Sequence, residues 1–531
     1  MFSKIWDAIR RIIERMTGTR SIEQALQIMP VISNKMEEAI ELWDKLYKNE
    51  APWLHEPTTG DPVKIISLGL AASIASEKAR SATIEMKSVI TDPSTLPTDE
   101  DENVKEDFTP TTRANYLNKQ YQLYLLPQIR QQLEYGIAKG GLIIKPYLYN
   151  GKELRFTFCQ ADEFYPISFD ASGKMTEAAF TEKLVNQNNC YTRLEYHKLD
   201  VKNNSVTVIN KAYKSLYRGD TGADELGTEI DLHSVSAWEN IEKETTINGV
   251  DRLLFAYFKM PEANTIDSTS PLGVSGYSKA INLIREADLQ FSRMMWEYDG
   301  GQLAIDVDQN ALKTTEVIRD GKKEFVEVPN ILQGRLFRKV DLGTEETYQV
   351  FNPNLRDNNY MMGLNNILMR IEDVCGISRG TFSDITRSEA KTATELMIMR
   401  QRSYATNADI QKALQKALED TVYVMNVYST LYNLAPEGAY AVSYEWDDSL
   451  ITNPDEELQR RLTLANAGVE SRINIRMWYY GETKEQAEQQ LALIDQEQLQ
   501  QAQLQALATG LVQQAQPQQP SPQPQQPSQQ Q

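Results

Sequence analysis

The chain has 531 residues, of which 41% are hydrophobic and 24% are charged, and its formal net charge is −19. This length predicts about three or four compact regions. An acidic surface repels phosphate and argues against tight, static DNA binding, although a channel through which DNA slides is compatible with it. The three cysteines, Cys159, Cys190 and Cys375, are far apart, and only three histidines occur. We therefore expect no disulfide framework, no metal, no cofactor and no histidine-based catalytic centre.

The sequence contains no run of 18 apolar residues and so predicts no membrane span. Near the N-terminus, residues 2–16 predict a helix with one apolar face. That face consists of Phe2, Ile5, Trp6, Ile9, Ile12, Ile13 and Met16. Charged residues interrupt this segment, which is unlike a signal peptide. The face suits either a membrane surface or docking on this protein or a neighbour, and we favour docking because no lipidation motif is present.

The first quarter of the chain is predicted to be mainly helical. Asp61-Pro62 marks a helix start, because proline is well accommodated at the first helical position. Pro127 is expected to interrupt a later helix, which Gly140-Gly141 then ends. The predicted elements are helices at 35–48, 62–80 and 112–138, a strand at 83–90, and an acidic loop at 92–107.

The pattern then changes to short alternating stretches. Turn dipeptides such as Asn150-Gly151 and Ser172-Gly173 separate these stretches, which is typical of antiparallel strands. Residues 142–217 therefore predict a largely antiparallel sheet, and residues 218–250 predict a loop-rich stretch.

Two predicted helices enclose a second group of strands. The helices cover residues 276–298 and 355–375, and the strands fall within 301–351, with a hairpin turn at Asp320-Gly321. The sequence thus predicts a small α/β module inserted between two helices.

A polar loop at 376–390 leads into a stretch, from Thr381 to Ala435, that contains neither Gly nor Pro. Most of this stretch predicts one helix of about 40 residues and about 60 Å. A helix of that length normally spans a subunit or packs against copies of itself. We expect a strand at 439–446, helices at 454–467, 472–480 and 483–509, and a disordered Gln/Pro-rich tail at 513–531.

Motifs for catalysis are absent from the sequence. It contains no G-x-x-x-x-G-K-[ST] phosphate loop, no G-x-S-x-G and no H-E-x-x-H. The acidic pairs Asp447-Asp448 and Glu372-Asp373 lack the spacing of a two-metal site, and we interpret them as surface or capping residues. The sequence favours an architectural protein over an enzyme.

Four segments, in this order along the chain, resemble one family. They are DEFYPISFDASGKM (162–175), SPLGVSGYSKAINLIREADLQFSRMMWE (270–297), CGISRGTFSDITRSEAKTATELMIMRQRSY (375–404) and YEWDDSLITNPDEELQRRLTLANAGVESR (444–472). Their order and spacing resemble the portal proteins of tailed bacteriophages. The nearest group is the portal, or minor capsid, proteins of siphophages that infect Gram-positive bacteria.

The resemblance implies an α+β, mainly helical portal-type fold with a wing, a two-helix stem, an α/β clip, a long wing helix and a helical crown. The implied boundaries are 1–265 (wing), 266–298 and 355–376 (stem), 299–354 (clip), 377–390 (tunnel loop), 391–450 (long helix and wing strand), 451–510 (crown) and 511–531 (disordered tail).

The resemblance also implies a non-enzymatic ring, usually of twelve subunits, at one capsid vertex of the virion. Such a ring conducts double-stranded DNA during packaging and ejection without reading its sequence. The implied partners are the terminase large subunit, the head–tail adaptor and the major capsid protein, with scaffold as a further candidate. Assembly would take place in the host bacterial cytoplasm. Two alternatives stay open: another head–tail connector or minor capsid protein, and a metal-dependent nucleic-acid enzyme.

Two groups of residues are candidates for the functional surfaces. The DNA-facing tunnel loop would include Ser378, Arg379, Gly380, Thr381, Ser383, Thr386, Arg387 and Ser388. The same stretch could instead be a plain surface connection, and its few apolar residues predict that deleting 380–388 spares the fold. The clip would present Lys322, Lys323, Arg335, Arg338 and Lys339. This basic group suits docking of the adaptor, the motor or passing DNA, and equally an ordinary solvated hairpin.

Overall fold

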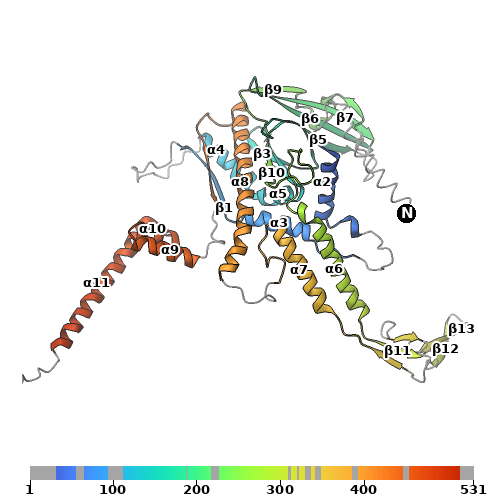
Figure 1. Cartoon of the computed structure of the whole chain (residues 1–531). Helices are drawn as coiled ribbons and strands as arrows, with labels where there is room; N and C mark the ends of the chain where they lie inside the picture. The colour runs from blue at the N-terminus through green and yellow to red at the C-terminus, as the bar shows by residue number, and fades with distance from the viewer. Residues whose placement is uncertain are drawn as a thin grey trace, which may run out of the picture. The chain divides into compact units, whose positions relative to one another are not determined.

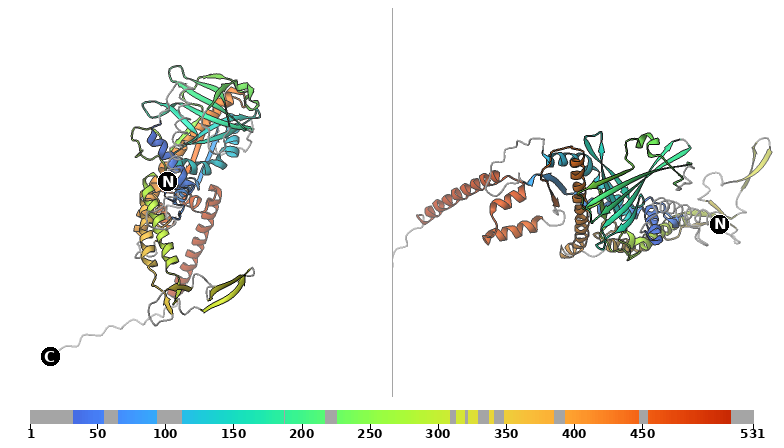
Figure 2. Two further views of the ribbon diagram at one scale, coloured as in Figure 1. Left: turned by 90° about the vertical axis from the view of Figure 1, so that its right-hand side faces the viewer. Right: turned by 90° about the horizontal axis from the view of Figure 1, so that it is seen from above.

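The structure is a computed structural model (Figures 1 and 2). It describes residues 32–54, 65–93, 112–186, 188–216, 226–308, 313–319, 322–328, 337–340, 348–384, 393–446 and 454–514. The predicted helix at 2–16, most of the acidic loop and the Gln/Pro-rich tail lie outside these residues. The chain divides into two compact units, Met1–Trp446 and Asp447–Gln531, and it mixes helices with sheets, as the sequence predicts.

The first unit begins with helix α2 (Asn34–Tyr47), where the Ser33 hydroxyl accepts a hydrogen bond from the Met36 amide. Helix α3 (Leu70–Thr83) starts later than the predicted 62–80. Residues 65–69 are not helical, because Gly69 adopts a left-handed conformation with φ 67° and the amides of Ile66 and Leu68 bond to side chains of a distant helix. These tertiary bonds override the helix start that proline suggests.

The predicted interruption near Pro127 is a local widening of the helix. Helix α4 (Arg113–Gln120) and helix α5 (Leu126–Lys139) are joined by a π-helical turn, η3 (Tyr121–Leu125). A π turn is one way in which a helix tolerates a proline that lacks the amide donor. Gly140, with φ 89°, ends α5 as predicted.

Two antiparallel sheets follow. One has the order β10-β2-β3, and the other has the order β4-β5-β6-β7-β8 with β9 also paired to β7. The bounds are β2 (Gly141–Tyr149), β3 (Glu153–Gln160), β4 (Phe164–Phe169), β5 (Met175–Asn186), β6 (Asn189–Asp200), β7 (Ser205–Leu216), β8 (Thr228–Ile230), β9 (Glu244–Asn248) and β10 (Ala256–Lys259). The predicted sheet region is confirmed. Strands β8, β9 and β10 were not predicted, because they are short and are defined by pairing with β7 and β2.

Helix α8 (Ala393–Leu431) has 39 residues, which confirms the predicted long helix. In its middle part the side chains of Ile410, Leu414 and Leu418 are fully buried, and the helix packs against β2, β10 and α3. Beyond it, β16 (Ala441–Trp446) pairs antiparallel with β1 (Met86–Thr91), which closes the first unit.

The second unit is helical. It contains α9 (Pro454–Asn466), α10 (Arg472–Tyr480) and α11 (Lys484–Gln514), close to the predicted ranges. Within the described ranges, no helix combines the length and hydropathy needed to cross a bilayer.

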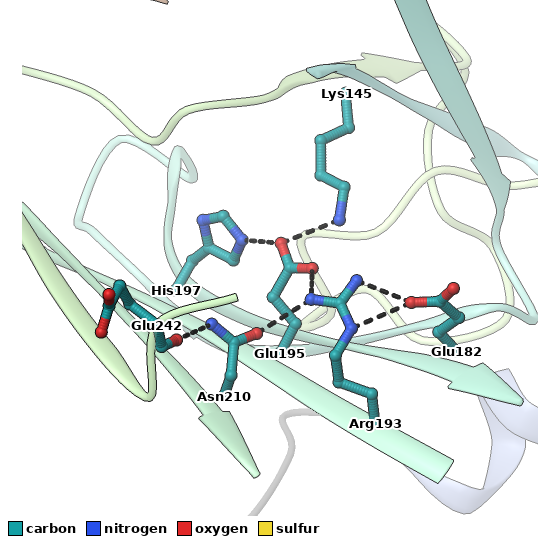
Figure 3. A network of polar contacts seen from close by, with 7 residues as sticks. All are labelled: Lys145, Glu182, Arg193, Glu195, His197, Asn210 and Glu242. Carbon is teal, nitrogen blue, oxygen red and sulfur yellow. Dashed lines mark hydrogen bonds and ion pairs between the residues drawn. The ribbon is translucent and has the colours of Figure 1, made fainter. Parts of the chain in front are cut away.

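A buried polar network joins the β10-β2-β3 sheet to the sheet that contains β4 to β9 (Figure 3). Glu195 on β6 accepts from Lys145 Nζ on β2 at 2.8 Å, from His197 Nε2 at 2.6 Å and from Arg193 at 2.9 Å. Arg193 also bonds to Glu182 and Asn210. Because Lys145 and Glu195 lie on different sheets, their ion pair fixes how the sheets pack.

The network sets the charge states of its members. Burial alone would raise the pKa of Glu195, but Lys145, His197 and Arg193 hold it well below its usual range. Burial lowers the pKa of His197 despite the adjacent carboxylate. Nδ1 of His197 is buried with no hydrogen-bond partner among the described residues. A neutral ring that donates from Nε2 explains this geometry, since a protonated ring would bury an unpaired donor.

The first unit is therefore expected to lose stability in acid. The unfolded chain takes up the His197 proton near pH 6.5 and the Glu195 proton near pH 4.5, before the folded chain does. The free energy of unfolding should thus fall as the pH drops below about 6.5, and further below about 4.5. Urea midpoints followed by circular dichroism from about pH 5.5 to 7.5 test this. His197→Gln should flatten the slope and His233→Gln, on the surface, should not; equal slopes in all three proteins would contradict the assignment.

Candidate functional site

Two neighbouring helices connect a small strand module to the rest of the first unit. Helix α6 (Ile281–Gly300) leads into the module, and helix α7 (Asp357–Cys375) leads out of it. The helices pack side by side in every view (Figures 1 and 2). Next to the module, Arg356 binds both carboxylate oxygens of Glu297, at 3.0 and 2.7 Å, and lowers the pKa of Glu297. This exposed pair contributes little stability but aligns the two helix ends.

At the other end, α6 is fixed by a buried carboxyl group. Asp288 accepts from Trp53 Nε1 and from the Leu68 amide, both at 2.9 Å. One turn later, the Ser292 hydroxyl accepts from the Ile66 amide at 2.8 Å. Burial raises the pKa of Asp288. The extended segment before α3 is thereby attached to α6.

The strand module contains two separate sheets. Strand β11 (Ala304–Asp308) pairs in parallel with β14 (Phe337–Val340) and antiparallel with β15 (Tyr348–Phe351). Strands β12 (Lys313–Arg319) and β13 (Lys322–Val328) form the predicted hairpin, although its turn, Asp320-Gly321, lies outside the described residues.

These sheets separate the basic residues assigned to the clip. Lys322 and Lys323 lie in β13, whereas Arg338 and Lys339 lie in β14. Arg335 lies outside the described residues. The sequence grouped the five residues as one face, but the described four come from two different sheets.

A tight turn follows α7. Gly376 ends the helix with φ 68°, and a Cβ atom there would lie 2.3 Å from Thr406 Oγ1 on α8. The Ile377 amide donates to the Glu372 carbonyl at 2.9 Å. Only glycine satisfies both the left-handed backbone and the close approach of α8.

The buried carboxylate of Glu372 organises the rest of this turn. Oε1 accepts from the amides of Phe382 (2.6 Å) and Ser383 (2.9 Å), and Oε2 accepts from the Ser383 hydroxyl (2.7 Å) and the Gly380 amide (3.3 Å). Glu372 has 0% exposure. A carboxylate that binds several amides fixes the path of the backbone, so Glu372 sets the direction in which the chain leaves α7.

Arg379 in the same turn forms a bidentate pair with Asp373, at 2.9 and 2.6 Å, which raises the pKa of Arg379. Its guanidinium therefore already holds one carboxylate within the subunit. Arg370, one turn earlier on α7, lies 3.9 Å from the same carboxylate and is largely exposed.

The structure distributes the predicted loop residues over three environments. Gly380 and Thr381 are exposed, and Ser378 and Arg379 are half-buried. Ser383 is buried and bonded to Glu372, so its hydroxyl anchors the turn and is not displayed on the surface. Thr386, Arg387 and Ser388 lie outside the described residues.

Glu372 was not recognised from the sequence as the organising residue. As part of an acidic pair it was interpreted as a surface or capping residue; the surface location is wrong, and its carboxylate binds amides of the turn rather than those of a helix end. Its position between Ile371 and Cys375, both buried, was the available signal. The expectation that deletion of 380–388 spares the fold stays a prediction, but these hydrogen bonds count against it, because the deletion would remove Gly380, Phe382 and Ser383, which donate to this buried carboxylate. Across the described ranges, no three His, Cys, Asp or Glu side chains gather as a metal site.

Replacement of Glu372 should therefore disorder the turn. Glu372→Ala leaves the amides of Phe382 and Ser383 without their acceptor and should cost about 2–4 kcal/mol. Glu372→Gln keeps one acceptor oxygen and should cost about half as much. Thermal unfolding and protease cleavage after Arg379 measure the two effects. Glu38→Ala, at an exposed position of α2, is a control, and equal stability of all variants would contradict the anchoring role.

Residues 82–503 match the family model described as "Phage portal protein, SPP1 Gp6-like". A search of curated proteins finds no match to this chain. The matched range begins before β1 and ends within α11, so it includes both helices, the strand module, the turn and α8. It covers most of the chain, and it confirms the resemblance that the four sequence segments indicated. The chain is therefore a member of the phage portal protein family, which performs a structural, portal function in the phage head.

Proposed function

We propose that the chain forms a closed ring, usually of twelve subunits in this family, that conducts double-stranded DNA through one capsid vertex of a siphophage infecting Gram-positive bacteria. The observation that supports this most is the continuous order of α6, strand module, α7, Glu372-held turn and α8. This order gives a projecting module for docking and, at the opposite end of α7, a turn that leads towards a long helix.

In this proposal α6 and α7 are the stem, and the strand module between them is the clip. The clip would bind the terminase large subunit during packaging and the head–tail adaptor afterwards. Its basic residues, Lys322, Lys323, Arg335, Arg338 and Lys339, would contribute to that surface. Projection by two helices suits this role, because it keeps the module accessible to large partners.

The wing would consist of the helices and sheets before α6 together with α8 and β16, and the crown of α9, α10 and α11. The wing and crown would contact the major capsid protein and, during assembly, scaffold. Assembly would occur in the host bacterial cytoplasm, and the product would remain in the virion.

The tunnel loop would begin at the turn after α7 and continue to the start of α8. We assign DNA contact to its exposed Thr381 and to Thr386, Arg387 and Ser388. Arg379 is already paired with Asp373, so it would meet phosphate only weakly. Weak, salt-screened contacts suit a channel in which DNA must move.

Imaging of the purified chain tests the ring. We expect annular particles in negative stain, with one closed symmetry along the axis and a mass many times that of one chain. A monomer at every salt and protein concentration would contradict the proposal.

A charge change tests the loop. Thr381→Asp combined with Arg387→Glu adds repulsion towards phosphate in every subunit, while the donors to Glu372 stay intact. We expect intact rings but roughly tenfold less DNase-protected DNA in capsids. The matched variant, Thr381→Ser with Arg387→Lys, should package normally. Full packaging by the acidic variant would remove this stretch from the DNA path.

A further inference from the structure

An open cavity of about 560 Å³ lies between α2, the end of β3, β4 and β5. Apolar side chains line part of it, among them Ile40, Phe158 and Phe164. Three carboxylates, Glu37, Asp162 and Glu163, and one cation, Lys183, also line it, so the charged part of the lining is acidic on balance. Cavities of this size accept a few side chains, and this lining favours an occupant that is apolar with a positively charged edge.

The carboxylates differ in their surroundings. Asp162 pairs with Lys139 at 2.7 Å, and Lys139 also pairs with Asp44 at 2.8 Å. Glu163 uses Oε2 to accept from the Gln160 amide at 2.8 Å, which fixes the side chain at the exposed edge. Glu163 is thus the carboxylate on which an arriving cation would act most directly.

One segment of this chain has the matching chemistry. Residues 2–16 carry the regularly spaced apolar residues listed above, with Lys4, Arg10, Arg11 and Arg15 against Asp7 and Glu14. The described chain begins at Ile32, which itself lines the cavity. Residues 17–31 connect the two and reach at most about 50 Å when extended, so the segment is tethered close to the cavity.

We propose that residues 2–16 dock in the cavity of their own subunit. The apolar face, with Trp6 as its largest side chain, covers the apolar lining, and Arg10, at the margin of this face, lies beside Glu163. Tethering favours this occupant over a separate partner, because the short connection keeps its effective concentration high. Docking also covers an apolar face that would otherwise promote association with membranes or other copies.

Cys159 lines the cavity and provides a native probe. In the full chain, Ile9→Cys should form a disulfide with Cys159 within one chain under mild oxidation. The reaction needs alkaline conditions, because burial raises the pKa of the Cys159 thiol to about 11. Asp7→Cys, on the opposite helical face, should not link, and Ile9→Cys with Cys159→Ser should give no product. Peptide mapping identifies the bond, and gel mobility separates links within one chain from links between chains.

Charge variants in the Ile9→Cys background make the test specific. Glu163→Lys should lower the yield of the link roughly tenfold. Glu163→Gln keeps the acceptor for the Gln160 amide and should lower it only a few-fold. Arg10→Glu with Arg11→Glu should restore linking to the Glu163→Lys protein. Retention of the wild-type oligomer by size exclusion shows that each variant folds.

Three outcomes would overturn the proposal. One is the absence of a link while the thiol at position 9 reacts freely with a maleimide. Another is a link that forms only between chains, which would assign the cavity to a neighbouring copy. The third is binding of the full chain to vesicles of anionic lipid through residues 2–16 without any link to Cys159, which would assign the segment to a membrane surface.

Discussion

The burial of α8 is the constraint on which the first unit depends. In its middle turns Ile410, Leu414 and Leu418 are inaccessible to solvent, and the helix contacts β2, β10 and α3, all of which come from much earlier in the chain. Even Thr421 and Ser429 are buried there, since each hydroxyl donates to a carbonyl one turn before it. A helix with such an apolar face needs partners that cover this face in water. The sheets and the N-terminal helices therefore cover the apolar face of α8, and α8 in turn buries their apolar side chains.

Buried carboxylates fix the direction of elements that apolar contacts hold together. Asp288 and Glu372 each fix one of the two helices that carry the strand module, and each does so by accepting backbone amides. An amide bound to a buried carboxylate specifies direction, whereas apolar contact alone allows sliding. The Lys145–Glu195 pair has the same effect between the two sheets. The acidic composition thus has an internal structural role as well as a surface one.

The succession of elements could be predicted from the sequence because it depends on local signals. The long α8 followed from a stretch without Gly or Pro, and the helix stop at Gly140 followed from a pair of glycines. The start of α3 could not be predicted, since hydrogen bonds to Asp288 and Ser292 hold residues 65–68 extended. Strands β8, β9 and β10 could not be predicted either, because they are short, and β10 pairs with β2, which lies much earlier in the sequence.

The positions of the turn and of the strand module in the chain could be predicted from the sequence, but the surroundings of their individual residues could not. A polar stretch between two helices marked the turn after α7, and a turn dipeptide marked the β12–β13 hairpin. Which loop residues are exposed and which are buried depends on Glu372, whose burial is indicated in the sequence only by its position between Ile371 and Cys375. The separation of Lys322 from Arg338 into different sheets likewise follows from strand pairing, which residue spacing does not encode.

The two helices that reach the strand module have a mechanical consequence. Any load on the module is divided between α6 and α7. It reaches the rest of the first unit at two separate points, near Asp288 and near Glu372. A single rod could swivel about its joint, but two rods clamped at different points resist twisting as well as tension. Torque applied at the module would thus be delivered to the turn after α7, directly before the start of α8.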